Sequence, residues 1–576
     1  MRHNKCDNED DESVSEVAVD TQPRSSLDAD SVSSYVENAP TSPTTARSVS
    51  PNESKRPVAW SELPRKDQLF IITMARMSEP LVQTSLQAYM FYQLKWFDPS
   101  LPDSTISSQA GVLHASFTAS QFLTAMMWGR IADSKRVGRK TVLLIGLLGT
   151  SISCLGFGFS TTFWQALLFR TLGGATNGNI GVMRTMISEI IREKKYQPRA
   201  FLLLPMTFNI GVIIGPILGG ILSDPAGSYP SLFGDIPFFV KFPYATPNIV
   251  SSFFLFFAAV AVWLGLEETH DILRDGPPDI GTRLGKRLIT HYRKRFGTSP
   301  EAEGYSAVPA SDVELRAGEE DTTRRQSTKR YTQRLPFRRI FTRNVLVTLA
   351  ANFLLAFHVG TFNSLWFVFL STPTSERETH LPFWFTGGLG LQPRSVGMAM
   401  AILGFIGINM QLFLYPHVSA RLGTIKSWRF FLVFFPVAYF LVPYLSVVPS
   451  TAPPPEAKAG ILIWIAICGV LFFQVTGRTF ALPSQVILVN NCSPHPSVLG
   501  TIHGLGQSAS SAARTIGPMV GGVVYGFGLN KGIIGLVWWA LSSVAVCACL
   551  MSLVVKEGDG HEIWLEGDVE DEPSTD

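Results

Sequence analysis

The first apolar stretch holds two ionisable residues, of which the carboxylate could bind and release a proton inside a membrane. Arg76 and Glu79 stand three residues apart, on one face of a helix, and Pro80 follows them. If the helix begins near residue 68, Glu79 lies ~16 Å along it, close to the middle of a bilayer. A carboxyl group at that depth can exchange a proton near neutral pH, so Glu79 is the candidate proton carrier. The alternative is a structural Arg76–Glu79 ion pair that only neutralises itself.

A second charge and several polar groups are predicted at a similar depth. Counted inward from residue 161, Arg170 also reaches the middle of the bilayer, where it could be a static tether between helices. We expect Arg478, His503 and Arg514 nearer helix ends, where long side chains reach the headgroups. Four polar side chains could line a central cavity or make satisfied interhelical hydrogen bonds: Asn209, Asn352, His358 and Gln507.

The stretch Trp128–Lys140, WGRIADSKRVGRK, has the residue types of a conformational latch. Gly129 allows close helix approach, Gly138 allows a tight turn, and Asp133 places a carboxylate at a helix end. That carboxylate can cap the N-terminus of a neighbouring helix or pair with Arg139. A contact that forms in one conformation and breaks in another would be a latch. A basic stop-transfer loop, the alternative, would explain the Lys and Arg residues but not this spacing.

The elements that position these residues are predicted to be membrane helices. The 576 residues are 46% hydrophobic and 16% charged, against about 25% charged in a soluble domain. A net charge of +3 gives no reason to expect nucleic acid. We predict an all-α membrane protein with twelve transmembrane helices, near residues 68–90, 111–128, 141–159, 163–185, 200–222, 249–266, 345–371, 395–415, 430–448, 459–482, 499–525 and 533–555.

A repeated motif indicates two pseudo-symmetric six-helix halves. GPILGG at Gly215–Gly220 returns as GPMVGG at Gly517–Gly522, each in the fifth helix of its half. In the first copy, Gly211, Gly215 and Gly219 are spaced by four and give a smooth strip for close packing. The predicted organisation is a disordered tail at 1–65, a first half at 66–266, a central linker at 267–343, a second half at 344–555 and an acidic tail at 556–576.

The distribution of Lys and Arg predicts the orientation. The loops near residues 129–140 and 192–199 are rich in basic residues, whereas 91–109 and 224–247 hold one Lys each. The positive-inside rule therefore puts the basic loops, both tails and the linker in the cytosol. Asn52 and Asn491, the two N-x-S/T sites, should then stay unglycosylated. The linker stretch Gly281–Arg295 is either a basic amphipathic helix on the membrane surface or a solvated charged segment.

The sequence gives no reason to expect a metal, a cofactor or an enzyme. The six cysteines form no CxxC pair, and no predicted membrane segment holds two of the ten His at i, i+4. No nucleophile–base pair stands near the membrane, and no GxxxxGK[ST] motif suggests ATP-driven transport.

These motifs resemble those of the major facilitator superfamily. The WGRIADSKRVGRK loop is similar to its signature loop, with one extra residue between Asp133 and Gly138, and LLFRTLGG around Arg170 is similar to its helix 4 motif. Gly211 with Gly215, Pro216, Gly219 and Gly220 resembles the helix 5 motif of its twelve-helix drug:proton antiporter branch. More narrowly, RMSEP, WGRIAD and Ser231–Phe238 are similar to fungal relatives of the zinc-induced facilitator-like proteins, whereas Glu267–His270 matches their PET-plus-His motif only loosely.

This resemblance, which covers about residues 65–556, implies a secondary transporter that exports a small organic solute in exchange for protons. It implies that Arg170 assists proton exchange and that the Gly211–Gly220 strip blocks proton leak. The alternatives are a proton-coupled uptake permease and a non-transporting membrane sensor. The expected partners are a small-molecule substrate, protons and the lipid bilayer, for a monomer in the plasma membrane rather than the vacuolar membrane. Ser42, Ser50 and Ser327 fit short kinase patterns.

Overall fold

The chain folds into helices, and the computed structural model assigns the described residues no other regular element apart from one isolated bridge between His380 and Trp384. The structure describes residues 60–101, 103–193, 195–274, 276–277, 279–296, 331, 333–375, 377, 379–391, 393–453, 456–566 and 568. These described residues belong to one compact unit. The predicted modification positions Ser42, Ser50, Asn52 and Ser327 lie outside the described residues, as does the predicted tail up to residue 59.

A first bundle contains the helices that hold the candidate proton carrier. It consists of α1 (Lys66–Phe97), α2 (Asp103–Ala132), α3 (Gly138–Gly158), α4 (Phe163–Thr176), α5 (Asn179–Ile190), α6 (Gln197–Leu222) and α10 (Ala245–Gly265). The short helices α7 (Pro225–Ser228), α8 (Pro230–Phe233) and α9 (Pro237–Lys241) connect α6 to α10. The long helices pack in pairs, α1 against α6, α2 against α4 and α3 against α10.

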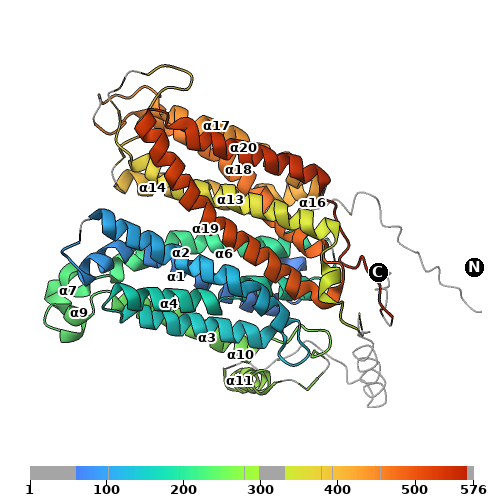
Figure 1. Ribbon diagram of the computed structural model, residues 1–576. Coiled ribbons are helices and arrows are strands. Elements are labelled where there is room, and N and C mark those ends of the chain that lie inside the picture. The colour runs from blue at the N-terminus through green and yellow to red at the C-terminus, as the bar shows by residue number, and fades with distance from the viewer. Residues whose placement is uncertain are drawn as a thin grey trace, which may run out of the picture. The chain divides into compact units, whose positions relative to one another are not determined.

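A second bundle follows the linker. It consists of α13 (Arg343–Ser371), α14 (Pro393–Asn409), the π-helical turn η4 (Met410–Leu414), α15 (Tyr415–Leu422), α16 (Thr424–Leu432), α17 (Phe434–Leu441), η5 (Val442–Ser446), α18 (Ile461–Asn491), η6 (Pro496–Val498), α19 (Leu499–Lys531) and α20 (Gly535–Val554). Figure 1 shows α19, in orange-red, running beside α2 of the first bundle, and the two helices are in contact. The bundles therefore meet along helices that carry polar side chains.

Eight helical segments among the described residues are long and apolar enough to span a membrane. They are α3, α6, α10, α13, residues 402–422, residues 424–446, α18 and α20. The predicted helices that miss this criterion are α1, α2, α19 and the pair α4 and α5. Arg76 and Glu79 lower the hydropathy of α1, and His503, Gln507 and Arg514 lower that of α19, whereas α4 and α5 are each too short. An all-helical membrane fold is confirmed.

Several helices depart from their predicted bounds. The segment predicted as one helix at 163–185 is α4 and α5, which are separated at Asn177 and Gly178. The break frees the Asn177 side chain, which donates to Glu79 across 2.8 Å. Residues predicted as one helix at 430–448 begin earlier, at Thr424, and change from α-helix to a 3-10 turn at Val442. Helix α18 continues to Asn491 and α19 to Lys531, beyond the ends predicted from hydropathy alone.

The linker stretch Gly281–Arg295, for which an amphipathic helix and a solvated charged segment were both left open, is helical in the structure, as α11 (Ile280–Phe296). A side chain at Gly281 or Gly285 would collide with the backbone carbonyls of Trp263 and Leu264, so these glycines let α11 pack closely on the end of α10. On another face, Ile280, Leu284 and Leu288 repeat every four residues and are 77%, 40% and 51% exposed. A helix with such an apolar stripe among basic residues suits a membrane surface.

Candidate functional site

The predicted latch carboxylate joins the two bundles. Asp133 Oδ1 accepts from Gly500 N at 2.9 Å, and Oδ2 accepts from Thr501 N and Thr501 Oγ1, each at 2.6 Å. These amides lie in the first turn of α19, which follows the capping residue Val498. Because the valine side chain cannot accept a hydrogen bond, Asp133 takes the place of the N-cap side chain. The carboxylate also complements the positive end of the helix dipole.

Arg139 connects Asp133 to the end of α5. Its Nη2 lies 3.1 Å from Asp133 Oδ1 and 2.7 Å from Glu189 Oε1, and its Nη1 donates to Ala132 O at 2.8 Å. The Arg139 and Asp133 side chains are fully buried. Burial raises the pKa of Asp133, and Arg139 and the Thr501 hydrogen bonds oppose that rise. One cation therefore holds two carboxylates at a point where the bundles touch.

A second carboxylate caps α3 in the same way, and the sequence reasoning assigned it no role. Glu268 accepts from Arg139 N and Lys140 N, each at 3.0 Å, at a helix start whose capping residue is Val137. Gly138 has a φ of +77° and faces the Glu268 carboxylate so closely that a Cβ would collide with it. The Glu268 carboxylate can therefore reach the start of α3 only because Gly138 adopts a positive φ and has no side chain. The sequence did point to this region, because Glu267–His270 loosely matches the PET-plus-His motif of the zinc-induced facilitator-like proteins.

The rest of that stretch completes what we call the latch cluster: Asp133, Arg139, Glu189, Glu268, Thr269, His270 and Thr501. Thr269 Oγ1 donates to Glu189 Oε2 at 2.5 Å, and His270 Nε2 lies 3.3 Å from the Asp133 carbonyl oxygen. Burial lowers the pKa of His270 to about 4, so its imidazole is neutral at neutral pH. The cluster thus holds α2, α3, α5 and α19 together, and because His270 is neutral it adds no positive charge to that of Arg139.

Glycines bring α2 and α19 together beside the latch cluster. A Cβ at Gly129 would collide with the Gly500 carbonyl and lie 3.1 Å from the Gly504 Cα. A Cβ at Gly504 would lie 2.8 Å from the Ala125 carbonyl oxygen. Gly129 was predicted to allow close approach, and its partners are the glycines of α19. At this end, therefore, the two bundles are in van der Waals contact.

Glu79 lies buried in the first bundle with partners on two elements. Its Oε2 accepts from Arg76 Nη1 at 3.0 Å, and its Oε1 accepts from Asn177 Nδ2 at 2.8 Å. Glu79 is 6% exposed and Arg76 is 8% exposed. Arg184 of α5 and Arg514 of α19 interact electrostatically with both groups. Three guanidinium groups therefore lie within electrostatic reach of one carboxylate.

Arg170 does not pair with Glu79. Its Nη2 donates to Gln83 Oε1 at 3.0 Å, one helical turn further along α1, and its guanidinium carbon lies 4.7 Å from the Phe117 ring centre. Arg170 is 6% exposed, and its Nε has no hydrogen-bond partner. The structure therefore places Arg170 on the same side of α1 as Glu79, in contact with a neutral side chain.

Each of the four cavity candidates makes a hydrogen bond between elements. Asn209 donates to Gln411 Oε1 at 3.1 Å, and Asn352 donates to the Gly506 carbonyl oxygen at 2.8 Å. Gln507 donates to Gln121 Oε1 of α2 at 3.2 Å. Asn209 and Gln507 thus lie where the two bundles meet.

The remaining candidate, His358, makes a hydrogen bond between α13 and α17, whereas the ionisable residues of α18 and α19 lie deeper than expected. His358 is fully buried in the second bundle, with Nδ1 3.0 Å from the Tyr439 hydroxyl. The expectation that Arg478 and Arg514 lie near helix ends is wrong, because both are near the middle of 31- and 33-residue helices. His503 does lie near the start of α19, but it is buried against Asn490 rather than exposed.

The glycine strip of α6 packs directly on α1. Cβ atoms at Gly211, Gly215 and Gly219 would lie closer than 3.0 Å to atoms of Pro80, Leu81, Thr84 or Ser85, whereas one at Gly220 would meet nothing within 4 Å. The repeated motif in α19 behaves alike, since Cβ atoms at Gly517 and Gly521 would collide with Thr361 of α13 and one at Gly522 would meet nothing. The repeat in sequence is matched by a repeat in contacts.

Two helical bundles that meet through a hydrogen-bonded latch, with buried charges near mid-helix, form the architecture of a membrane transporter. The family model described as Major Facilitator Superfamily matches residues 69–518, and the chain belongs to this family. It is therefore a secondary transporter of a small-molecule substrate and not an enzyme. The family resemblance noted in the sequence is confirmed.

Individual relatives agree with this membership. The chain is 34% identical over 524 residues to the major facilitator superfamily multidrug transporter mfsB of Aspergillus fumigatus, covering 87% of this chain and 85% of that one. It is 24% identical over 460 residues to the zinc induced facilitator 1 protein of Arabidopsis thaliana, covering 80% and 84%. The crystal structure of the human organic anion transporter MFSD10 matches with a TM-score of 0.55 at 16% identity, covering 85% and 99%. That structural likeness concerns the fold alone.

Proposed function

We propose that this chain exports a small organic solute by exchange for protons. The observation that carries the proposal is Glu79, a buried carboxylate at the centre of α1 with partners on α1 and at the α4–α5 break. Buried ionisable groups in membrane helices are costly and commonly mark ion or proton pathways. The similarity to a fungal multidrug transporter supports drug-like solutes as the cargo.

The helices support a twelve-span arrangement with two pseudo-symmetric halves. The first six spans are α1, α2, α3, α4 with α5, α6 and α10. The last six are α13, α14 to α15, α16 to η5, α18, α19 and α20. The positive-inside rule puts the latch cluster, both termini and the linker on the cytosolic side, and the plasma membrane is the expected location.

In this orientation the structure corresponds to a carrier closed toward the cytosol. The Asp133–α19 hydrogen bonds and the Gly129–Gly500 crossing would have to separate before a solute could enter from that side. Alternating access then consists of making and breaking the latch around a central site. The latch cluster sets the balance between the two states.

Protonation of Glu79 would change the charge balance of the central site. The neutral acid no longer attracts Arg76, so the guanidinium becomes available to an acceptor group on the solute. The Nε atoms of Arg76, Arg170 and Arg184 are buried without partners, which adds unused donors. Proton and solute would therefore alter the same group of charges, and solutes with anionic or acceptor groups should bind best.

The test uses inside-out vesicles with an acidic lumen and a pH-sensitive dye. A panel of organic anions, cations and neutral drugs is added to vesicles that contain the protein and to protein-free vesicles. We expect at least one organic compound to discharge the gradient only when the protein is present, with anions the most effective. Absence of any discharge from protein shown to be folded would contradict proton antiport.

A further inference from the structure

The C-terminal tail folds back onto the loop between α18 and α19. Gly560 N donates to the Asn491 carbonyl oxygen at 3.0 Å, and Ile563 N donates to the Pro494 carbonyl oxygen at 2.8 Å. Ile563 and Leu565 pack against a buried apolar cluster that includes Leu335, Val498 and Ile502. The described part of the tail, residues 556–566 and 568, is therefore attached next to the start of α19, the helix end that Asp133 caps.

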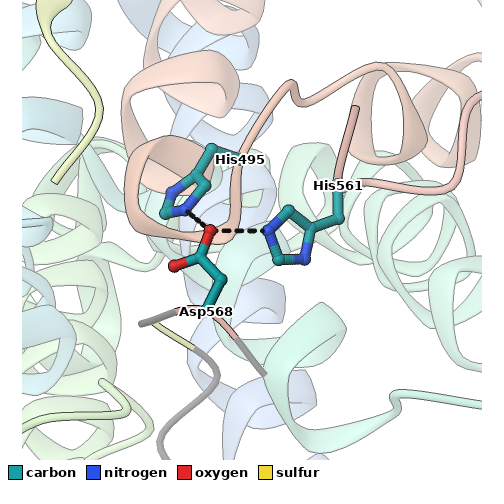
Figure 2. A group of neighbouring side chains, drawn as sticks. All are labelled: His495, His561 and Asp568. Carbon is teal, nitrogen blue, oxygen red and sulfur yellow. Dashed lines mark hydrogen bonds and ion pairs between the residues drawn. The ribbon is translucent and has the colours of Figure 1, made fainter. Parts of the chain in front are cut away.

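The attachment brings together two histidines and a carboxylate from distant parts of the chain (Figure 2). His495 belongs to the loop, while His561 and Asp568 belong to the tail. Asp568 Oδ2 lies 2.9 Å from His495 Nε2 and 3.1 Å from His561 Nε2. One potential ligand atom from each residue lies within 4.8 Å of the other two. Figure 2 shows the carboxylate between the two imidazole rings.

We propose that His495, His561 and Asp568 bind a divalent transition metal, with Zn²⁺ the best fit. Zinc takes nitrogen ligands at ~2.0–2.1 Å and carboxylate oxygens at ~2.0–2.2 Å, usually with tetrahedral angles. Two ligand atoms at those distances and angles are ~3.3 Å apart. The observed 2.9 and 3.1 Å N···O separations are slightly shorter than this spacing, and the two imidazole nitrogens lie within 4.8 Å of each other, so a small rearrangement of the three side chains would admit the ion.

The hydrogen bonding of Asp568 favours a cation at this point. Its Oδ2 is close to three nitrogen atoms, those of both imidazoles and the Leu565 amide, whereas Oδ1 is buried with no partner. The Asp568 side chain is 1% exposed, so water does not readily satisfy that oxygen. A metal bound to the carboxylate would use its lone pairs and neutralise a buried charge.

The neighbours of the histidines can support metal binding. His495 Nδ1 accepts from Ser497 N at 3.1 Å and lies 2.6 Å from Ser497 Oγ. When Nε2 binds the metal, its proton would move to Nδ1, which would give up the amide hydrogen bond and donate to the Ser497 hydroxyl instead. The His561 ring stacks on Trp564 with ring centres 3.8 Å apart, which fixes its plane. His561 is 12% exposed, so solvent reaches this side chain, and a water would complete a tetrahedral ligand set.

A metal at this site would fasten the tail to the start of α19. Opening of the latch requires the first turn of α19 to move away from Asp133, and His495 lies four residues before the Leu499 that begins this helix. The bound metal would therefore link divalent cations in the cytosol to the transport cycle. This role is separate from the cargo and from Glu79.

The test measures Co²⁺ and Zn²⁺ binding to the full-length protein, purified with an affinity tag that contains no histidine. We expect one Co²⁺ per chain with the visible absorption of a tetrahedral site, displaced by Zn²⁺. His561→Ala and Asp568→Asn should weaken binding by more than about 100-fold, and His561→Cys should restore it with a sulfur-to-cobalt absorption. His291→Ala, at an exposed histidine of α11, is the matched control and should bind normally.

A second measurement reports the tail itself. Limited proteolysis should cleave residues 556–568 slowly when Zn²⁺ is present and quickly after chelation, and the two rates should be equal in His561→Ala. Wild-type protein that binds no more metal than His561→Ala would overturn the proposal. So would binding that survives in both His561→Ala and Asp568→Asn, because the metal would then lie elsewhere.

Discussion

Single residues hold two helix starts that their own sequences leave uncapped. Val137 precedes α3 and Val498 precedes α19, and neither side chain can accept a hydrogen bond. Glu268 supplies the cap of α3, and Asp133 supplies the cap of α19. The first contact lies within one bundle and is expected to persist. The second joins two bundles, so in the proposed transport cycle it is the contact that would break when the carrier opens toward the cytosol.

The first prediction concerns Asp133→Asn. The amide keeps one oxygen acceptor but presents its NH₂ group to a backbone N–H donor. Arg139 also loses one of the two carboxylates that balance its charge. Breaking a buried ion pair costs about 3–5 kcal/mol, so the ratio of closed to open carrier should fall by roughly 150- to 5,000-fold. Distances between spin labels on the latch-side ends of α2 and α19 should shift to longer values. Lys135→Gln, an exposed change in the same loop, should leave them unchanged.

Asp133 and its possible partner Arg139 could be predicted from sequence, but the partners of Asp133 on α19 could not. The spacing of Gly129, Asp133 and Gly138 indicated a carboxylate poised at a helix end. Its partner Gly500 is 367 residues away, and nothing in a local pattern specifies such a pair. Arg170 shows the same limit, because its depth was predictable while its partner Gln83 stands 87 residues earlier in the chain, on α1.

Among the helices, the paired glycine strips explain how closely α1 and α6, and α13 and α19, can approach. Spacing by four places glycines along one helix face, and the facing helix supplies Thr84 in one bundle and Thr361 in the other. The strip was predictable because helical periodicity is local. The break between α4 and α5 was not, because Asn177 leaves the helix to reach Glu79.

The second prediction compares two alanine substitutions in one motif. Gly215→Ala places a methyl group against Thr84 and the Leu81 carbonyl, so α1 and α6 must separate. Overpacking of this kind costs about 1–3 kcal/mol, and the melting temperature of the purified protein should fall by several degrees. Gly220→Ala meets open space and should melt like the wild type. Equal melting temperatures for the two variants would contradict the packing described.

The third prediction concerns α11, for which a membrane-surface position stays a proposal. A spin label at Leu288, on the exposed apolar stripe, should be accessible to oxygen and shielded from a polar nickel chelate. A label at Thr290, which is exposed on a different face, should show the reverse. Similar accessibility at both positions would indicate that α11 is a solvated helix.

At the scale of the whole molecule, the two bundles and the position of the latch suit a carrier with both termini in the cytosol. The sequence predicted this organisation because membrane spans and the Lys and Arg bias are properties of long segments. The tail contact through His495 and Asp568 could not be predicted, since its residues are scattered and polar.

The fourth prediction tests orientation with engineered glycosylation sites. Asp235→Asn with Pro237→Thr creates Asn-Ile-Thr in the loop between α6 and α10, which should face away from the cytosol and become glycosylated. Arg325→Asn creates Asn-Gln-Ser in the linker and should stay unmodified. Electrophoretic mobility before and after glycosidase treatment reports both results. Glycan on the linker site would reverse the proposed topology.

The measurement that tests the central claim most directly separates two reactions in Glu79→Gln vesicles. Solute exchange at equal pH on both sides requires the carrier to alternate but moves no net protons, whereas accumulation driven by a pH gradient requires proton coupling. With the solute found in the panel experiment, we predict that Glu79→Gln keeps exchange and loses gradient-driven accumulation, while wild type and Asp235→Asn keep both. Gradient-driven accumulation that persists in Glu79→Gln would contradict the assignment of Glu79 as the proton carrier.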